Sequence, residues 1–311
     1  SLTGKNVSAN FSVGANNFLM QATTTPEDFE LNLQLCRAKL LYSGFREEAT
    51  DFINKLLDQR YNSLASNIQD YFRNAISKKI SGNNSAQYLP ERKIIEAITL
   101  SEIKEWLLGQ FSNSPMEINV VGDIDEQKTV ELVAIYFGSL PERQKITSPN
   151  RKTMEVKEKF EITEDFKTTI KKALVFMMIP TIDYREIEEV RKLNLLGQVL
   201  GEKTRKLIRE KLSISYSPGA GHSFNKDFKN SCYLQFIADV EPQNVEAVKN
   251  AFDSIIKETA ENGVTSEELE GVRKPTLTSI HTYIKTNGYW LDRVLSDSTA
   301  EPEALKVALT F

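Results

Sequence analysis

The stretch Leu207-Ile208-Arg209-Glu210-Lys211-Leu212-Ser213-Ile214-Ser215-Tyr216-Ser217-Pro218-Gly219 changes its hydrophobic period part-way along. Up to Leu207, leucines recur at helical spacing, which predicts a helix with one apolar face. From Leu212 onward, apolar residues alternate with serines, which predicts a strand that ends in a turn at residues 218–221. The stretch therefore predicts that Arg209 lies near the end of a helix and that Tyr216 lies on a strand. The leucines of the helix are Leu193, Leu196, Leu200 and Leu207.

Arg209 and Tyr216 bring two kinds of hydrogen-bond donor into this unit. A guanidinium offers a planar fork of N–H donors and a phenol offers an O–H, which suit a peptide carbonyl or the oxyanion formed when that carbonyl is attacked. The alternative is structural, with Arg209 capping the last carbonyls of the helix and Tyr216 half-buried on a sheet. For an isolated Arg and Tyr, the structural alternative is favoured.

Two segments of the chain resemble one known family. The first is the quoted stretch with its leucine-rich helix. The second is Ile118-Asn119-Val120-Val121-Gly122-Asp123-Ile124-Asp125, followed by an apolar helical pattern and Gly138-Ser139-Leu140-Pro141. Both are similar to the C-terminal half of insulinase/pitrilysin-type zinc peptidases, and the likeness runs in order over nearly the whole chain. The resemblance implies that Arg209 and Tyr216 contact peptide substrate opposite the zinc ion.

The zinc signature of that family is missing from this sequence. The family binds zinc through His-x-x-Glu-His on a helix, with two imidazole ligands and a Glu as general base. This chain has only His222 and His281, and neither has a second His or a Cys at the spacing of a metal pair. We expect His222 either to approach substrate from a loop or to hydrogen-bond locally, and His281 to pack in a helix. We therefore predict no metal ligand and no catalytic residue in this chain.

The resemblance also places the zinc elsewhere in a longer protein. The helix that donates the third zinc ligand in the family corresponds by chain order to Phe52–Arg73, which contains Asp58 and Asp70 but no Glu. The strand and helix that carry the zinc motif, or its remnant, would precede Ser1. The resemblance thus implies an N-terminally truncated first domain and a zinc-bearing N-terminal half, on the same chain or on a separate subunit.

Composition narrows the class of protein further. A net charge of -4 and no basic stripe interleaved with aromatics argue against nucleic-acid binding. No apolar run approaches the length of a membrane span. Cys36 falls on the apolar face of a helical pattern and Cys232 in an alternating pattern, so both are expected to be buried and not paired in a disulfide. The sequence does not indicate a compartment.

Length and an internal repeat predict two related domains. A chain of 311 residues exceeds the usual size of a single core. The polar, proline-containing stretch at residues 141–152 is the best boundary, which gives residues 1–145 and 146–311 as the two domains. A strand, a Pro at the first helical turn and an apolar-faced helix recur in order at residues 18–44 and 233–263, and Thr265 with Glu268 predicts a capping box for the next helix.

The fold class predicted from these patterns is α+β, with expected strands near residues 6–13, 117–121 and 173–179. The resemblance implies two consecutive domains, each an antiparallel-rich sheet with helices on one face, that together form one half of a clamshell. It implies as function the C-terminal part of a zinc metalloendopeptidase, inactive alone, that binds a peptide or small protein and completes the active site. A non-catalytic structural subunit and a peptide-binding module of the same fold stay open as alternatives.

Overall fold

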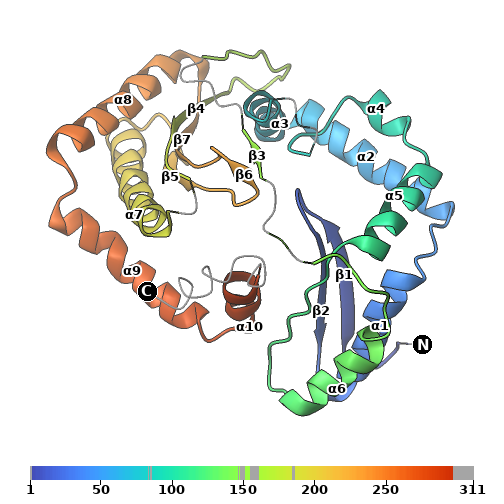
Figure 1. Ribbon diagram of the computed structural model, residues 1–311. Helices are drawn as coiled ribbons and strands as arrows, with labels where there is room; N and C mark the ends of the chain where they lie inside the picture. The colour runs from blue at the N-terminus through green and yellow to red at the C-terminus, as the bar shows by residue number, and fades with distance from the viewer. Residues whose placement is uncertain are drawn as a thin grey trace. The chain divides into compact units, whose positions relative to one another are not determined.

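The computed structural model describes residues 2–82, 84, 86–145, 147, 151–154, 161–183 and 186–296, shown in Figure 1. By their contacts, these residues group into two compact units. The first unit draws on residues 1–57, 90–150 and 283–311, and the second on residues 58–89 and 151–282. The predicted domain division, residues 1–145 and 146–311, assigns residues 58–89 and 283–296 differently and stays a prediction.

Helices outnumber strands in the described part of the chain. The helices are α1 Phe29–Leu41, α2 Glu48–Ser66, α3 Ile68–Ile80, α4 Arg92–Glu96, α5 Leu100–Asn113, α6 Glu126–Phe137, α7 Ile187–Thr204, α8 Val245–Asn262, α9 Ser266–Tyr283 and α10 Asn287–Tyr289. The strands are β1 Val7–Val13, β2 Phe18–Thr24, β3 Lys152–Thr153, β4 Ala173–Pro180, β5 Gly219–Ser223, β6 Phe228–Lys229 and β7 Tyr233–Val240. This mixture confirms the predicted α+β class.

The first unit is built around an antiparallel hairpin. Strands β1 and β2 pair in register from Val7 opposite Thr24 to Val13 opposite Phe18. Helix α1 packs against both strands and against α6. Helix α6 begins at a side-chain cap, because the Asp125 carboxylate accepts the Lys128 backbone N–H at 2.8 Å. The hairpin and its helices confirm the strand and helix predicted for this part of the repeat.

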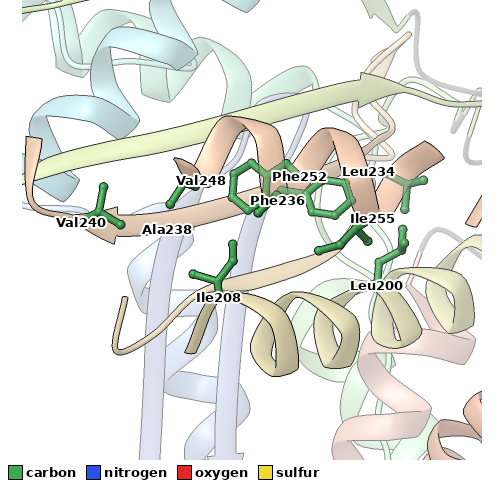
Figure 2. Close-up of a cluster of buried hydrophobic side chains, with 10 residues drawn as sticks. Leu200, Ile208, Leu234, Phe236, Ala238, Val240, Val248, Phe252 and Ile255 are labelled. Carbon is green, nitrogen blue, oxygen red and sulfur yellow. The ribbon is translucent and has the colours of Figure 1, made fainter. Parts of the chain in front are cut away.

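The second unit holds a three-stranded antiparallel sheet in the order β4-β7-β5. Alternate residues of the central strand β7 are buried, which is the pattern of a sheet with one face in a core. Helices α7 and α8 contact the sheet, and helix α3 contacts β4. Figure 2 shows the resulting core, in which the rings of Phe236 from β7 and Phe252 from α8 lie 5.3 Å apart between centroids.

The predicted repeat is confirmed in the arrangement of its elements. In the first copy, β2 leads through a 3-10 turn at Pro26–Asp28 into α1. In the second, β7 leads through a 3-10 turn at Pro242–Asn244 into α8. The predicted capping box is also present, because the Thr265 N–H donates to Glu268 Oε2 at 2.9 Å and the Glu268 N–H donates to Thr265 Oγ1 at 3.2 Å.

Two predicted strands are wrong. Residues 117–121 form no strand with any described partner, and Ile118 and Val120 of this segment, with the preceding Met116, instead line an apolar groove of about 650 Å³ together with α6. Residues 212–217 are irregular, and the turn predicted at residues 218–221 is wrong from Gly219 onward, where strand β5 begins. The error has one cause, because alternation reports which side chains face inward whereas a strand also needs a partner backbone.

Candidate functional site

The helix that carries Arg209 changes its winding before it ends. Helix α7 passes directly into a π-helix, Arg205–Lys211, which is closed by a 3.0 Å hydrogen bond from the Leu212 N–H to the Leu207 carbonyl. Wide π-turns shift the side chains that follow them around the helix and are frequent at functional sites. Ile208 is completely buried in the core and fixes the turn, so that the next residue, Arg209, is exposed.

The segment that carries Tyr216 is held by the inward-facing residues Ile214, Ser215 and Pro218. Ser213 has a φ of 55°, in the left-handed region, which is incompatible with a continuous strand. Beyond it, Ile214 packs against the core, Ser215 and Pro218 are buried, and Tyr216 is 78% exposed. The predicted alternation is therefore wrong here, because the neighbours Ile214 and Ser215 both face inward whereas Tyr216 and Ser217 are both exposed.

Arg209 and Tyr216 meet at the surface. The guanidinium carbon of Arg209 lies 4.8 Å from the centroid of the Tyr216 ring, which is a cation–π contact. Because both side chains are exposed, this contact contributes only about 0.5–1 kcal/mol. Neither side chain forms a hydrogen bond or an ion pair with any residue that the structure describes. The guanidinium N–H groups and the phenol are therefore open to a ligand, and Arg209 does not cap the helix.

His222 is engaged in local hydrogen bonds. Its Nδ1 lies 2.9 Å from Asn194 Oδ1 and its Nε2 lies 3.0 Å from Thr181 Oγ1, so the neutral ring donates from Nδ1 and accepts at Nε2. Burial lowers the pKa of His222 below its usual value. The residue belongs to strand β5 and not to a loop, and both of its nitrogens already have partners. Of the two interpretations of His222, the structure favours local hydrogen bonding.

The remaining candidates for metal chemistry are separated from one another. His281 lies on α9 and is exposed, so the prediction that it packs is wrong. Cys36 is partly buried and Cys232 is buried, and the two are not joined in a disulfide. Burial raises the pKa of the Cys36 thiol. Across the described ranges, no three His, Cys, Asp or Glu side chains come together as metal ligands would, so these residues do not fit a zinc centre.

The backbones of α7 and β5 approach each other closely at two glycines, which the sequence did not lead us to predict. A Cβ added to Gly197 would lie 2.5 Å from the His222 backbone nitrogen, and one added to Gly201 would lie 2.9 Å from the Ala220 carbonyl oxygen. Only glycine allows this approach. The signal in the sequence was the Gly-x-x-x-Gly spacing at residues 197–201, facing a strand that itself begins Gly-Ala-Gly.

A family model described as "Peptidase M16 inactive domain" matches residues 97–275, which include α7, the π-helix, Arg209 and Tyr216. The chain belongs to the peptidase M16 family. Its predicted resemblance to the C-terminal, non-catalytic half of insulinase-like peptidases is thereby confirmed. The matched description is that of the inactive domain of an M16 peptidase, in agreement with the absence of His-x-x-Glu-His from the sequence.

Individual relatives are distant in sequence. The chloroplastic stromal processing peptidase of Pisum sativum is 19% identical over 310 residues, and the match covers 83% of this chain and 24% of the pea protein. A conserved protein of Enterococcus faecalis V583 has a TM-score of 0.78 at 13% identity, over 96% of this chain and 73% of that chain. The periplasmic protease PqqL of Escherichia coli has a TM-score of 0.73 at 15% identity, over 98% and 34%. The structural matches show the fold, and this chain spans about a quarter of the pea relative.

No helix in the described residues is both long enough and apolar enough to cross a membrane.

Proposed function

We propose that this M16 chain is the C-terminal, non-catalytic part of a zinc metalloendopeptidase and that it binds peptide substrate through Arg209 and Tyr216. The observation that supports the proposal most directly is the open Arg209–Tyr216 pair, whose donors have no partner among the described residues. An unpaired guanidinium next to an unpaired phenol is suited to a peptide carbonyl or a carboxylate. The similarity to a stromal processing peptidase and to a periplasmic protease supports peptides or proteins as the substrate class.

In the proposed mechanism, zinc-activated water is the chemistry supplied by the other half of the enzyme, in cis or in trans. The contribution of this chain is to orient the substrate. Arg209 donates N–H groups from a fixed position at the end of the π-helix, and Tyr216 donates its O–H from the neighbouring segment. A donor aimed at the oxyanion is worth about 2.7–4 kcal/mol in comparable sites. This chain alone is expected to be inactive.

The test is hydrolysis of a quenched fluorogenic peptide mixture by the intact protein, meaning this chain together with its catalytic half. Arg209→Ala and Tyr216→Phe are expected to lower kcat by about 10²–10³ if the side chains contact the oxyanion. A rise in KM with unchanged kcat would instead mean that the two side chains bind the substrate equally well in its ground state and in the transition state. Two matched controls are exposed residues with no described partner: Lys206→Ala, which removes a charge from the same π-helix, and Tyr42→Phe.

The alternative is a structural or peptide-binding chain of the same fold that supports no cleavage. The observation that favours it is the family description as an inactive domain. This alternative predicts that the intact assembly is indifferent to both Arg209→Ala and Tyr216→Phe. For a peptide-binding chain in particular, affinity for a labelled peptide would be the same with zinc and with a chelator present.

A further inference from the structure

We propose that Ser215 and Asp239 are positioning residues that hold Tyr216 against Arg209. The pair is asymmetric, because Arg209 follows a completely buried residue in a hydrogen-bonded helix, whereas Tyr216 lies on an irregular segment. Among the described residues 212–218, the last backbone N–H that donates to another backbone group outside a helix or strand is that of Ile214, which bonds to the Ile208 carbonyl at 3.2 Å. The place of the Tyr216 backbone therefore depends on the side chains beside it.

Ser215 supplies the anchor immediately before Tyr216. Its hydroxyl donates to Asp239 Oδ1 at 3.3 Å, and the residue is only 8% exposed. Asp239 stands on the central strand β7, opposite Leu174 of β4, so it is one of the more rigid points in the unit. At 3.3 Å between the two oxygens this is a long O–H···O hydrogen bond, and its acceptor is a carboxylate. It ties the irregular segment to the middle of the sheet.

Lys172 completes the arrangement from the other side of Asp239. Its ammonium group lies 3.2 Å from Asp239 Oδ2, so each carboxylate oxygen has one partner. Holding Oδ2 fixes the direction in which Oδ1 faces Ser215. The chain of contacts Lys172, Asp239, Ser215 thus ends one residue before the ring that covers Arg209.

The anchoring of Tyr216 by Ser215 and Asp239 should affect substrate binding, and this consequence rests on the proposed function. If Arg209 and Tyr216 bind substrate, a Tyr216 held in place before binding spares the cost of ordering it, which for one side chain amounts to about 0.5–1.5 kcal/mol. Loss of the anchor should then weaken substrate binding by about two- to tenfold. Ser215 and Asp239 need no contact with substrate for this effect.

The first measurement does not depend on substrate. Because the Arg209 guanidinium lies 4.8 Å from the Tyr216 ring centroid, its nearby protons are expected to be shifted upfield in the NMR spectrum of this chain, and Tyr216→Leu gives the value without the ring. Ser215→Ala and Asp239→Leu are each expected to lose most of that shift, and the double variant to lose no more than either alone. Ser217→Ala is the matched control, because Ser217 is exposed, adjacent to Tyr216 and without a described partner. Ser217→Ala is expected to keep the full shift.

The result that overturns the proposal is an unchanged Arg209 shift in Ser215→Ala while the spectrum of the core residues Phe236 and Phe252 is intact. Should Asp239→Leu disturb that core, Ser215→Thr keeps the hydroxyl and is expected to keep the shift. The second measurement is KM and kcat of the intact protein on the fluorogenic peptides. A lost shift with unchanged kinetics would support the positioning and reject the proposed function, whereas a lost shift with a raised KM supports both.

Discussion

At the scale of single residues, Arg151 is a buried charged side chain of the second unit that depends on its hydrogen-bond partners. Its side chain is only 3% exposed, and it donates to both carboxylate oxygens of Asp183, at 3.0 and 3.1 Å, and to the Phe228 carbonyl at 2.6 Å. The bidentate geometry is one that Lys cannot reproduce. Arg151 therefore joins the chain entering β3 to the segments before α7 and at β6.

We predict that Arg151→Ala lowers the free energy of unfolding of the second unit by about 3 kcal/mol, because it removes the bidentate partner of the Asp183 carboxylate and one of the two donors to the Phe228 carbonyl, the other being the Ser231 hydroxyl. The partial exposure of Asp183, at 30%, keeps the estimate at the low end of the range for buried pairs. Urea denaturation measures this loss in the free energy of unfolding. The control is Arg73→Ala, since Arg73 is 77% exposed and lies 3.9 Å from Asp70. A loss in Arg73→Ala equal to that in Arg151→Ala would contradict the argument.

The lowered pKa of His222 predicts that the stability of the fold depends on pH. Burial lowers the pKa of this imidazole in the folded state below the unfolded value of about 6.5. Because the unfolded chain binds the proton more readily, the contribution of neutral His222 is fully present above about pH 6.5 and is lost as the pH falls below that value. The stability difference between the protein and His222→Asn should therefore shrink from pH 7.5 to about pH 5.5. A difference that stays constant with pH would reject this prediction.

At the scale of elements, two glycines of α7 allow its backbone to pack closely against β5. Gly197→Ala would bring a methyl group to within 2.5 Å of the His222 backbone, and a strand backbone has little room to shift. We expect a loss of about 1–3 kcal/mol, in spite of the better helix propensity of Ala.

Gly271→Ala on α9 is the matched control for that substitution. A Cβ at Gly271 meets nothing within 4 Å, so the same replacement should stabilise the helix by about 0.5–1 kcal/mol. Thermal unfolding of the two variants gives the comparison. Shifts of the same sign for Gly197→Ala and Gly271→Ala would mean that close packing at residue 197 does not matter.

At the scale of the whole molecule, the two compact units provide separate optical signals. Both tryptophans, Trp106 and Trp290, belong to the first unit, whereas far-ultraviolet circular dichroism reports the helices of both. We predict that Arg151→Ala moves the circular dichroism transition to lower urea while the tryptophan fluorescence transition stays in place, because units with their own cores unfold separately. Transitions that move together would show that the units unfold as one.

The sequence predicted those parts of the fold that local periodicity specifies. The alternating pattern of β7 predicted a strand with the observed bounds, and the apolar face of α8 predicted a helix. The same succession of strand, proline turn and helix predicted the first copy of the repeat. Residues 117–121 and 212–217 have an equally good strand pattern and form no strand among the described residues. The difference is a partner backbone, which lies far away in the chain and leaves no mark on the local sequence.

The candidate site shows the same division. The chain by itself determined which residue types stand at positions 209 and 216, that no His-x-x-Glu-His occurs, and that a leucine-rich helix leads into the site. The tertiary structure alone decided that Arg209 lies over the Tyr216 ring, that Ser215 bonds to Asp239, and that α7 approaches β5 closely at Gly197. These contacts depend on a π-turn, a left-handed Ser213 and pairings between distant segments. Such features follow from the packing of a whole core, whereas a periodic pattern reports only the face of one element.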